Sequence, residues 1–200
     1  MDKAPLRVGK LTRTTKETDI SVEINLDGTG INSIDTGIPF LDHMLDLFSK
    51  HGFFDLTVKC DGDIEIDYHH TIEDLALALG AVIKEALGDK ARIRRYGSFL
   101  LPMDEALARV VLDLSGRPFL VYNVEFPRTH IKDIDVQMFH EFFYALSARV
   151  GMNLHIDLIR GNEIHHCIEG IFKGFAKALD IAVSYDDRLV GVMSTKGILD

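Results

Sequence analysis

Hydrophobic and polar residues alternate early in the chain and then change to a helical spacing. The segment "ISVEINLDGTG" places apolar side chains at every second position from Ile20 to Leu26, which predicts a half-buried strand ending in a glycine-rich turn. In the next segment, "IPFLDHMLDLFSKHG", apolar residues recur with helical spacing after Pro39, and Gly52 marks the end of the predicted helix. The pattern therefore predicts a strand followed by a helix in this opening part.

The following segments continue the alternation of strands and helices. We expect two short strands in "FFDLTVKCDGDIEI", turning at Asp61 and Gly62, and a long helix in "HHTIEDLALALGAVIKEALGDK". The segment "ALARVVLDLSGRPFLVYNVEF" predicts a hairpin that turns at residues 115–118. It is followed by a predicted helix in "VQMFHEFFYALSARVG", a strand in "NLHIDLIRG" and a second long helix in "EIHHCIEGIFKGFAKALDIAV".

Matching positions of histidine and glycine relate the two halves of the chain. His43 precedes His69 by 26 residues, and His140 precedes His165 by 25 residues. A glycine closes the first predicted helix in each half. These matches indicate that one unit of strands, helix, strand and helix has been duplicated within the chain.

A duplicated unit of this kind predicts an α+β fold with two sheets and four helices packed between or upon them. We expect residues 1–93 and 94–200 to form the two halves. No low-complexity linker separates them, so they should pack as one compact unit. No GxGxxG motif or P-loop follows a predicted strand, which disfavours a doubly wound nucleotide-binding sheet.

Composition and charge narrow the class of protein. The chain has no apolar run long enough to span a membrane and no apolar signal region at its N-terminus, which predicts a cytoplasmic protein without a membrane partner. Two cysteines and no CxxC motif fit a reducing compartment. A net charge of −9 argues against a general nucleic-acid-binding protein, but a few local cations could still bind a small phosphate-bearing substrate.

The pattern His-His-x-x-Glu occurs twice, each time at the start of a predicted long helix. On a helix, residues four apart share a face, whereas adjacent residues point about 100° apart. His69 can therefore share a face with Glu73 while His70 points elsewhere, and the second copy repeats this arrangement. Each preceding helix supplies one further histidine. The eight candidate metal ligands are His43, His69, His70, Glu73, His140, His165, His166 and Glu169.

This donor set predicts two reactive metal ions. Imidazole and carboxylate groups suit manganese, iron or zinc. Four protein ligands for each ion would leave an octahedral ion with open positions, as in a reactive site. We expect the adjacent histidines of each pair to serve different ions, with ligands from different subunits at each site. A single copy of the pattern could be only a polar helix start, but two copies at matching positions disfavour that interpretation.

Several cations and hydroxyl groups at predicted turns could bind a phosphate, although a single surface cation is usually only solvated. These residues are Arg95, Arg117, Ser194, Thr195 and Lys196.

Other polar residues allow two interpretations. Glu17 could be only an exposed charge beside a strand, and Asp104 and Glu105 are typical of a solvated turn. Lys173 follows a candidate ligand by four residues, so it could form a simple ion pair or contact a substrate. His51 shares a helical face with the upstream histidine of the first half and could line the same site.

Long, ordered segments of the chain resemble the imidazoleglycerol-phosphate dehydratase family of histidine biosynthesis. The matching segments are "IPFLDHMLDLFSKHG", "DYHHTIEDLALALG", "RYGSFLLPMDEALARVVLDLSGRP", "FHEFF", "GNEIHHCIEGIFKGFAKAL" and "STKG". The resemblance implies a four-helix layer packed between two mainly antiparallel sheets, in a form without a fused phosphatase domain. It further implies a homo-oligomer of 24 subunits built from trimers, with two Mn(II) ions per subunit at the subunit contacts.

The resemblance also implies a reaction, the loss of water from D-erythro-imidazole glycerol phosphate to give imidazole acetol phosphate. The hydrogen that is removed lies on a carbinol carbon without a neighbouring carbonyl group. The imidazole ring must therefore serve as the electron reservoir, and two metal ions would stabilise the ring as an imidazolate. The implied catalytic residues are Glu17, His69, Glu73 and Glu169. The implied substrate-binding residues are Glu17, His43, His51, His69, Arg95, Arg117, His165, Lys173, Ser194, Thr195 and Lys196.

Two other classes of protein remain open. A dinuclear metallohydrolase would bridge its metals, roughly 3.5–4 Å apart, through a shared carboxylate or hydroxide, and no bridging aspartate is evident. A non-catalytic metal-binding shell protein would resemble ferritin, with Glu-rich sites in a helix bundle, whereas the sites here are rich in histidine.

Overall fold

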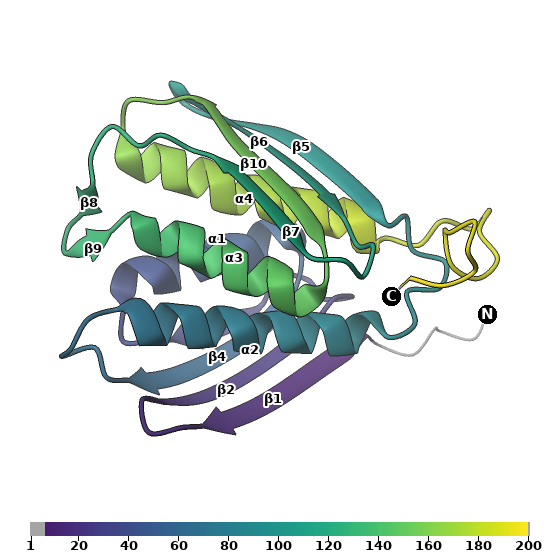
Figure 1. The fold of residues 1–200 in the computed structure, drawn as a ribbon, viewed down its shortest axis with the longest axis horizontal. Coiled ribbons are helices and arrows are strands. Elements are labelled where there is room, and N and C mark those ends of the chain that lie inside the picture. Colours follow the sequence, from purple (N-terminus) through teal and green to yellow (C-terminus); the bar gives the residue numbers. More distant parts are fainter. Residues whose placement is uncertain (1–6, 200) are drawn as a thin grey trace.

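In the computed structural model, which describes residues 7–199, two four-stranded sheets enclose a layer of four helices (Figure 1). The first sheet contains, in spatial order, β1 (Val8–Thr14), β2 (Thr18–Asn25), β4 (Asp55–Gly62) and β3 (Asn32–Asp35). The second contains β5 (Tyr96–Met103), β6 (Ala106–Asp113), β10 (Asn153–Arg160) and β7 (Phe119–Asn123). The helices are α1 (Pro39–Gly52), α2 (His69–Leu87), α3 (Gln137–Val150) and α4 (Ile164–Val183), and a short ribbon of β8 (His130–Ile131) and β9 (Ile134–Asp135) precedes α3. The predicted α+β fold is confirmed.

The two sheets have the same strand order and the same strand directions. In each sheet three antiparallel strands are followed by one parallel edge strand, β3 in the first and β7 in the second. The registers also correspond, since Val8 pairs with Asn25 in the first sheet and Tyr96 pairs with Asp113 in the second. This correspondence is the arrangement expected from an internal duplication, while the boundary between residues 93 and 94 stays a prediction.

A glycine at the second position of β1 and of β5 allows a long helix to approach each sheet closely. A Cβ atom added to Gly9 would overlap the carbonyl group of Val82 in α2. A Cβ atom added to Gly97 would overlap the carbonyl group of Ala178 in α4. The two halves therefore use the same contact to fix the distance between helix and sheet.

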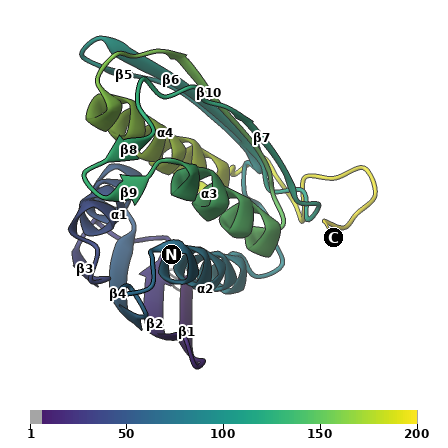
Figure 2. The ribbon, with the colours of Figure 1, turned by 60° about the vertical axis from the view of Figure 1, so that its left-hand side comes forward.

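The helix layer joins the two halves crosswise. Helix α1 packs against α4, and α2 packs against α3, so each long helix lies beside the shorter helix of the other half (Figure 2). Phe48 of α1 stacks on Phe175 of α4 with ring centroids 5.6 Å apart, and Phe143 of α3 contacts the same ring at 5.5 Å. Each fully buried phenylalanine contributes about 1.5–3 kcal/mol of apolar burial. The two halves thus share one hydrophobic core.

Two of the predicted strand arrangements are wrong. Strands β6 and β7 do not form a hairpin, because β10 lies between them and pairs with both. The turn at residues 115–118 instead carries the chain past β10 to the edge of the sheet. Residues 63–66, expected to form a second short strand after β4, form turns in which the N–H of Ile66 donates to the carbonyl oxygen of Asp63.

The cysteines behave as small apolar side chains. Cys60 and Cys167 are both buried and neither forms a disulfide. Burial raises the pKa of each thiol to about 11, so both stay protonated at neutral pH. Within residues 7–199, none of the helices combines the length and the apolar character needed to cross a bilayer.

Candidate metal and substrate site

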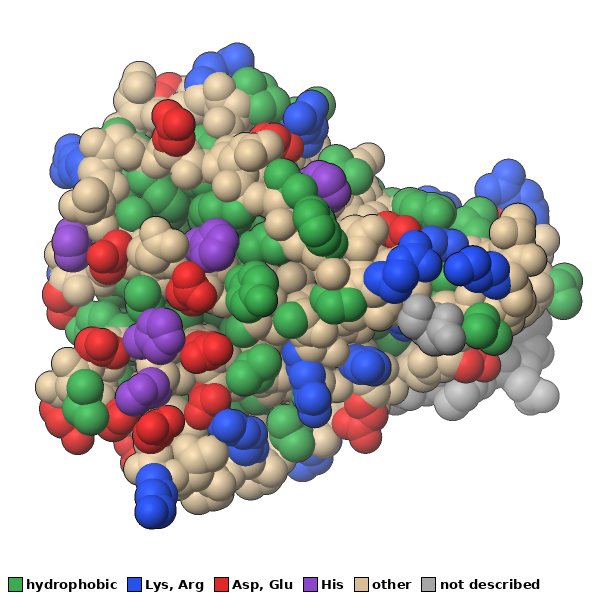
Figure 3. All heavy atoms as spheres, in the orientation of Figure 1, with side chains coloured by type: hydrophobic (Ala, Val, Ile, Leu, Met, Phe, Trp, Pro, Cys, Tyr) green, Lys and Arg blue, Asp and Glu red, His purple; other side chains and the backbone are tan. Residues whose placement is uncertain are grey.

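The candidate metal ligands gather at the end of the helix layer where α2 and α4 begin. Both His-His-x-x-Glu segments occupy the first turns of these helices. Figure 3 shows histidine and acidic side chains interspersed on one face at this end, away from the C-terminal segment. Imidazole and carboxylate groups are thereby brought close together, as a metal site requires.

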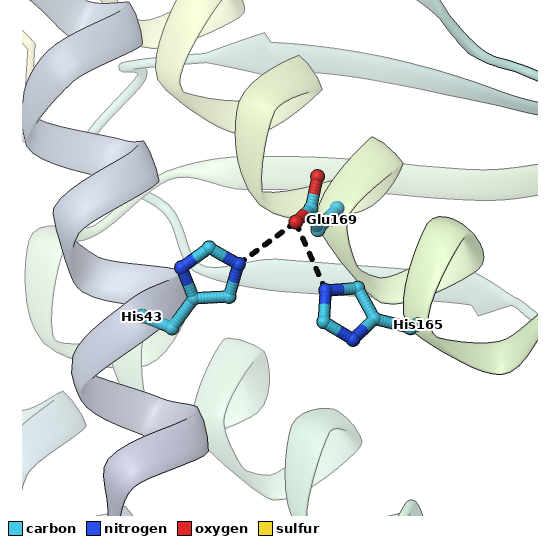
Figure 4. A group of neighbouring side chains, drawn as sticks. All are labelled: His43, His165 and Glu169. Atoms are coloured by element: carbon cyan, nitrogen blue, oxygen red, sulfur yellow. Dashed lines mark hydrogen bonds and ion pairs between the residues drawn. The ribbon is translucent and has the colours of Figure 1, made fainter.

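Three of the candidate ligands meet where α1 packs against α4 (Figure 4). The Nε2 atoms of His43 and His165 lie 2.8 and 3.0 Å from the same carboxylate oxygen of Glu169. The three donor atoms lie within 4.8 Å of one another, and among residues 7–199 this is the one group of three donors so close together. Its donor types and spacing fit one metal ion.

Glu169 is a charged group that the helix layer buries. Its residue is 6% exposed, and the Nζ of Lys173, one turn further along α4, donates a hydrogen bond of 2.5 Å to Oε2. Burial by itself would raise the pKa of this carboxyl group. The hydrogen bonds from Lys173, His43 and His165 outweigh burial and lower the pKa to about 2. The carboxylate is therefore ionised at neutral pH, as a metal ligand must be.

The equivalent pair on α2 is more open. The Nε2 of His69 lies 3.5 Å from the carboxylate of Glu73, and the two side chains are 43% and 45% exposed. His140 lies on the neighbouring helix α3, where its ring meets Tyr122 edge-on at 5.3 Å and its Nδ1 lies 3.0 Å from a carboxylate oxygen of Glu141. Within the described part of the chain, no third donor joins His69 and Glu73 as closely as in the group on α4.

Adjacent histidines point in different directions, as helix geometry predicts. The rings of His69 and His70 make an angle of 85°, with centroids 6.1 Å apart. The rings of His165 and His166 make an angle of 82°, with centroids 6.5 Å apart. The assignment of each neighbour to a different ion stays a prediction.

The second histidine of each pair contacts a carboxylate through Nδ1. His70 lies 3.0 Å from Asp63, and His166 lies 2.8 Å from Glu105. These hydrogen bonds raise the pKa of both imidazoles, and the bond to His166 is the main cause that lowers the pKa of Glu105 to about 2. Glu105 also accepts two backbone N–H groups just before α4. The carboxylate of Glu105 is therefore held by three hydrogen bonds, whereas its local sequence indicates a solvated turn residue.

Glu17 lies in the turn between β1 and β2, beside the segment that leads into α2. Its carbonyl oxygen accepts a hydrogen bond of 3.0 Å from the N–H of Asp63, and its own N–H donates to the hydroxyl of Thr15. Its side chain is exposed, and its carboxylate makes no hydrogen bond to another residue in the described range. The charge of Glu17 is near enough to raise the pKa of His70, after the larger effect of Asp63.

His51 lies near the end of α1, close enough to Lys173 and Lys177 of α4 for their charges to act on it. Burial lowers the pKa of its imidazole, and the charges of Lys173 and Lys177 lower it further. His51 therefore stays neutral at physiological pH.

The residues expected to bind a phosphate line one cavity of about 150 Å³. Arg117 and Lys196 have exposed side chains, and neither forms an ion pair with another described residue. Arg95 is anchored by two hydrogen bonds to Asp113, of 2.7 and 3.0 Å, and by one to the carbonyl oxygen of Met193. The polar lining comprises Arg95, Ser115, Arg117, Ser194, Thr195 and Lys196. Of these, Ser115 is not among the residues expected from the sequence to bind a phosphate, although it belongs to the same turn as Arg117.

The cavity and the histidines lie at opposite ends of the helix layer. The N–H of Arg95 donates to the carbonyl oxygen of Ala182 in the last turn of α4, whereas His165 lies in its first turn. A rise of 1.5 Å per residue separates these positions by about 25 Å. In Figure 3, lysine and arginine side chains gather beside the C-terminal segment, whereas the face with interspersed histidine and acidic side chains lies at the other end. A small phosphate ester cannot reach both regions of one chain.

Comparison of the chain with known proteins identifies the family to which it belongs. A family model described as imidazoleglycerol-phosphate dehydratase matches residues 36–179. The chain belongs to the imidazoleglycerol-phosphate dehydratase family. A relative of this name from Lachnoclostridium phytofermentans is 56% identical, over 97% of this chain and 99% of the relative. Another, from Shouchella clausii, is 55% identical, over 95% of this chain and 97% of the relative.

Solved structures of imidazoleglycerol-phosphate dehydratases have the same fold. The enzyme from Staphylococcus aureus is 38% identical and superposes with a TM-score of 0.82, covering 90% of this chain and 99% of that one. The enzyme from Pyrococcus furiosus, solved in complex with (S)-C348, is 34% identical with a TM-score of 0.80, covering 94% of this chain and all of that one. The predicted class, a hydro-lyase of histidine biosynthesis, is confirmed by this membership.

Proposed function

We propose that the chain dehydrates D-erythro-imidazole glycerol phosphate to imidazole acetol phosphate in a Mn(II)-dependent site shared between subunits. The observation that carries this proposal is the separation of about 25 Å between the histidines and the phosphate cavity of one chain. The substrate has an imidazole ring and a phosphate group only a few bonds apart. A second subunit must therefore bring its cavity beside the histidines of the first.

The donor set supports two metal ions per subunit. His43, His165 and Glu169 would hold part of the ligand set of one ion, since their donor atoms already lie within 4.8 Å of one another. The carboxylate of Glu169 is ionised, and its burial would exclude competing water. The remaining ligands of the two ions would be His69, His70, Glu73, His140 and His166, some of them from neighbouring subunits.

The metals and the protein would divide the chemistry between them. When bound, the ions would supply Lewis-acid stabilisation of the negative charge that the imidazole ring must accept, commonly worth several kcal/mol. Arg117 and Lys196 would bind the phosphate by charge-assisted hydrogen bonds, with Ser194 and Thr195 as further donors. Glu17, whose carboxylate has no partner in the described part of the chain, would transfer a proton. A positioned acid or base contributes about 10²–10⁴-fold to the rate.

The assembly would be a homo-oligomer in which metals bridge subunits, and 24 subunits built from trimers is the arrangement we propose. Ligands that diverge from one helix, such as His165 and His166, suit ions at subunit contacts because one ion cannot readily use both. The two unpaired, buried cysteines fit the cytoplasm as the compartment.

Removal of the metal tests this proposal. The protein would be treated with a chelator, and its size by light scattering and its formation of the ketone product would be followed before and after addition of Mn(II). We expect dehydratase activity and assembly size to fall together and to recover together. A metal-free monomer with full activity would contradict both the metal requirement and the shared site.

A further inference from the structure

The second histidine of each adjacent pair makes the same kind of hydrogen bond. His70 contacts the carboxylate of Asp63 through Nδ1 at 3.0 Å, and His166 contacts that of Glu105 through Nδ1 at 2.8 Å. Within the described range the Nε2 atom of neither ring has a hydrogen-bond partner. A carboxylate oxygen of Asp104 lies 3.8 Å from Nε2 of His166, beyond hydrogen-bonding distance. A neutral imidazole that donates its Nδ1–H to a carboxylate carries its lone pair on Nε2.

The two carboxylates come from different places in the duplicated fold. The registers of the β1–β2 and β5–β6 hairpins place Glu17 and Glu105 at equivalent positions, each immediately before the second strand. In the second half, Glu105 reaches the histidine. In the first half, the equivalent Glu17 does not, and Asp63 makes the contact instead.

The two halves differ in the length of the connection between the last strand and the long helix, and this difference explains why Asp63 takes the place of Glu17. Six residues, 63–68, join β4 to α2, whereas three residues, 161–163, join β10 to α4. The longer connection forms a turn closed by the N–H of Ile66 and the carbonyl oxygen of Asp63, and it places the Asp63 side chain beside His70. In the shorter connection, the N–H groups of Asn162 and Glu163 donate to Glu105 instead.

We infer that Asp63 and Glu105 are positioning residues that hold Nδ1 of His70 and His166 so that Nε2 of each ring faces a metal ion. Because Asp63 performs this task in the first half, the carboxylate of Glu17 is left free for proton transfer. The inference rests on the proposed metal binding. Loss of a hydrogen-bond partner of this kind commonly weakens metal affinity about 10–100-fold.

Amide substitutions distinguish a positioning role from a merely structural one. An asparagine or glutamine side chain keeps a carbonyl oxygen that can accept Nδ1–H, whereas alanine removes the acceptor. Asp63→Asn should therefore recover most of the metal affinity that Asp63→Ala loses. Glu105 uses both of its oxygens, Oε2 for His166 and Oε1 for two backbone N–H groups, so Glu105→Gln should recover less. Glu65→Gln is the matched control, since Glu65 is exposed in the same connection as Asp63.

The experiment is a titration of the full-length, chelator-treated protein with Mn(II), in which free Mn(II) is measured by electron paramagnetic resonance. We expect each alanine variant to weaken one class of bound ion about 10–100-fold, with no change in Glu65→Gln. The metal-free melting temperature should stay close to that of the wild type in Asp63→Ala and should fall in Glu105→Ala, which also loses the acceptor of two backbone N–H groups. Wild-type affinity in the alanine variants, or equal losses in Asp63→Ala and Asp63→Asn, would overturn the inference. Asp63→Leu and Glu105→Met, which keep side-chain volume without an acceptor, replace any alanine variant that fails to fold, with the same losses expected. A wild-type protein that does not bind Mn(II) would refute the proposed function instead.

Discussion

The ammonium group of Lys173 donates a hydrogen bond to the carboxylate of Glu169, one turn earlier on the same helix. Both side chains are largely buried, and the same carboxylate also meets the rings of His43 and His165. Lys173 therefore helps to keep this buried carboxylate ionised. This relationship makes Lys173 part of the candidate metal site, although its ammonium group has no lone pair to offer a metal.

Replacement of Lys173 by methionine should destabilise the metal-free protein by about 2 kcal/mol, because a buried charge loses a charged hydrogen-bond donor. Urea denaturation in the presence of a chelator measures this change. Lys177→Met is the matched control, since Lys177 lies one turn later and its ion pair with Asp180 is longer, at 3.5 Å, and more exposed. We expect the control to lose less than about 1 kcal/mol. Equal losses in the two variants would show that the pair with Glu169 has no special role.

The neutral state of His51 should make stability depend on pH in a defined direction. Burial and the charges of two lysines lower the pKa of His51 below its ordinary value of 6.5, so protonation opposes folding. The stabilising effect of the neutral ring is present above pH 6.5 and is lost as the pH falls through the lowered pKa. As the pH is lowered from 8 to 5.5, the unfolding free energy of the wild-type protein should therefore fall more than that of His51→Asn. A constant difference in unfolding free energy across this range would contradict the argument.

The cavity at the C-terminal end should bind phosphate through Arg117. Removal of this exposed cation in Arg117→Gln should weaken charge-assisted hydrogen bonds worth about 1.5–3 kcal/mol, which corresponds to about a tenfold to hundredfold change in affinity. Inhibition by inorganic phosphate measures the effect directly. Arg92→Gln serves as the control, because Arg92 is 53% exposed and pairs with Asp187 outside the cavity lining. An unchanged inhibition constant in Arg117→Gln would show that the cavity does not bind the phosphate group.

The helices of this fold could be predicted from the sequence because their signals are local. The apolar stripe of Leu41, Leu45 and Phe48 is fully buried, as its spacing predicts. Strand pairing could not be predicted, because it depends on residues far apart. The turn at residues 115–118 has the composition of a hairpin turn, yet β7 pairs with β10, which follows about thirty residues later. Strands β1, β3 and β5 were not predicted, and β3, with one apolar residue, has little local pattern to detect.

The candidate site shows the same division between local and non-local information. The His-His-x-x-Glu segments could be recognised because helix geometry fixes which side chains share a face. The cations of the cavity were only weak candidates one by one, and the fold supplies the evidence by bringing them together. Glu105 was missed because a turn carboxylate that binds a histidine looks the same in sequence as one that faces water. Asp63 was missed for the same reason, and only the strand registers reveal that it replaces the equivalent of Glu105.

In the proposed assembly, one substrate is bound by the histidines of one subunit and the cavity of another. Two differently tagged variants, Glu169→Gln and the double variant Arg117→Gln with Lys196→Ala, would be co-expressed, and oligomers containing both would be isolated by tandem affinity purification. Each variant alone should be nearly inactive. The mixed oligomers should regain up to about one quarter of wild-type dehydratase activity, the share of intact sites expected from random pairing in a symmetric assembly. Mixed oligomers no more active than the two parent variants would show that no site is shared between subunits.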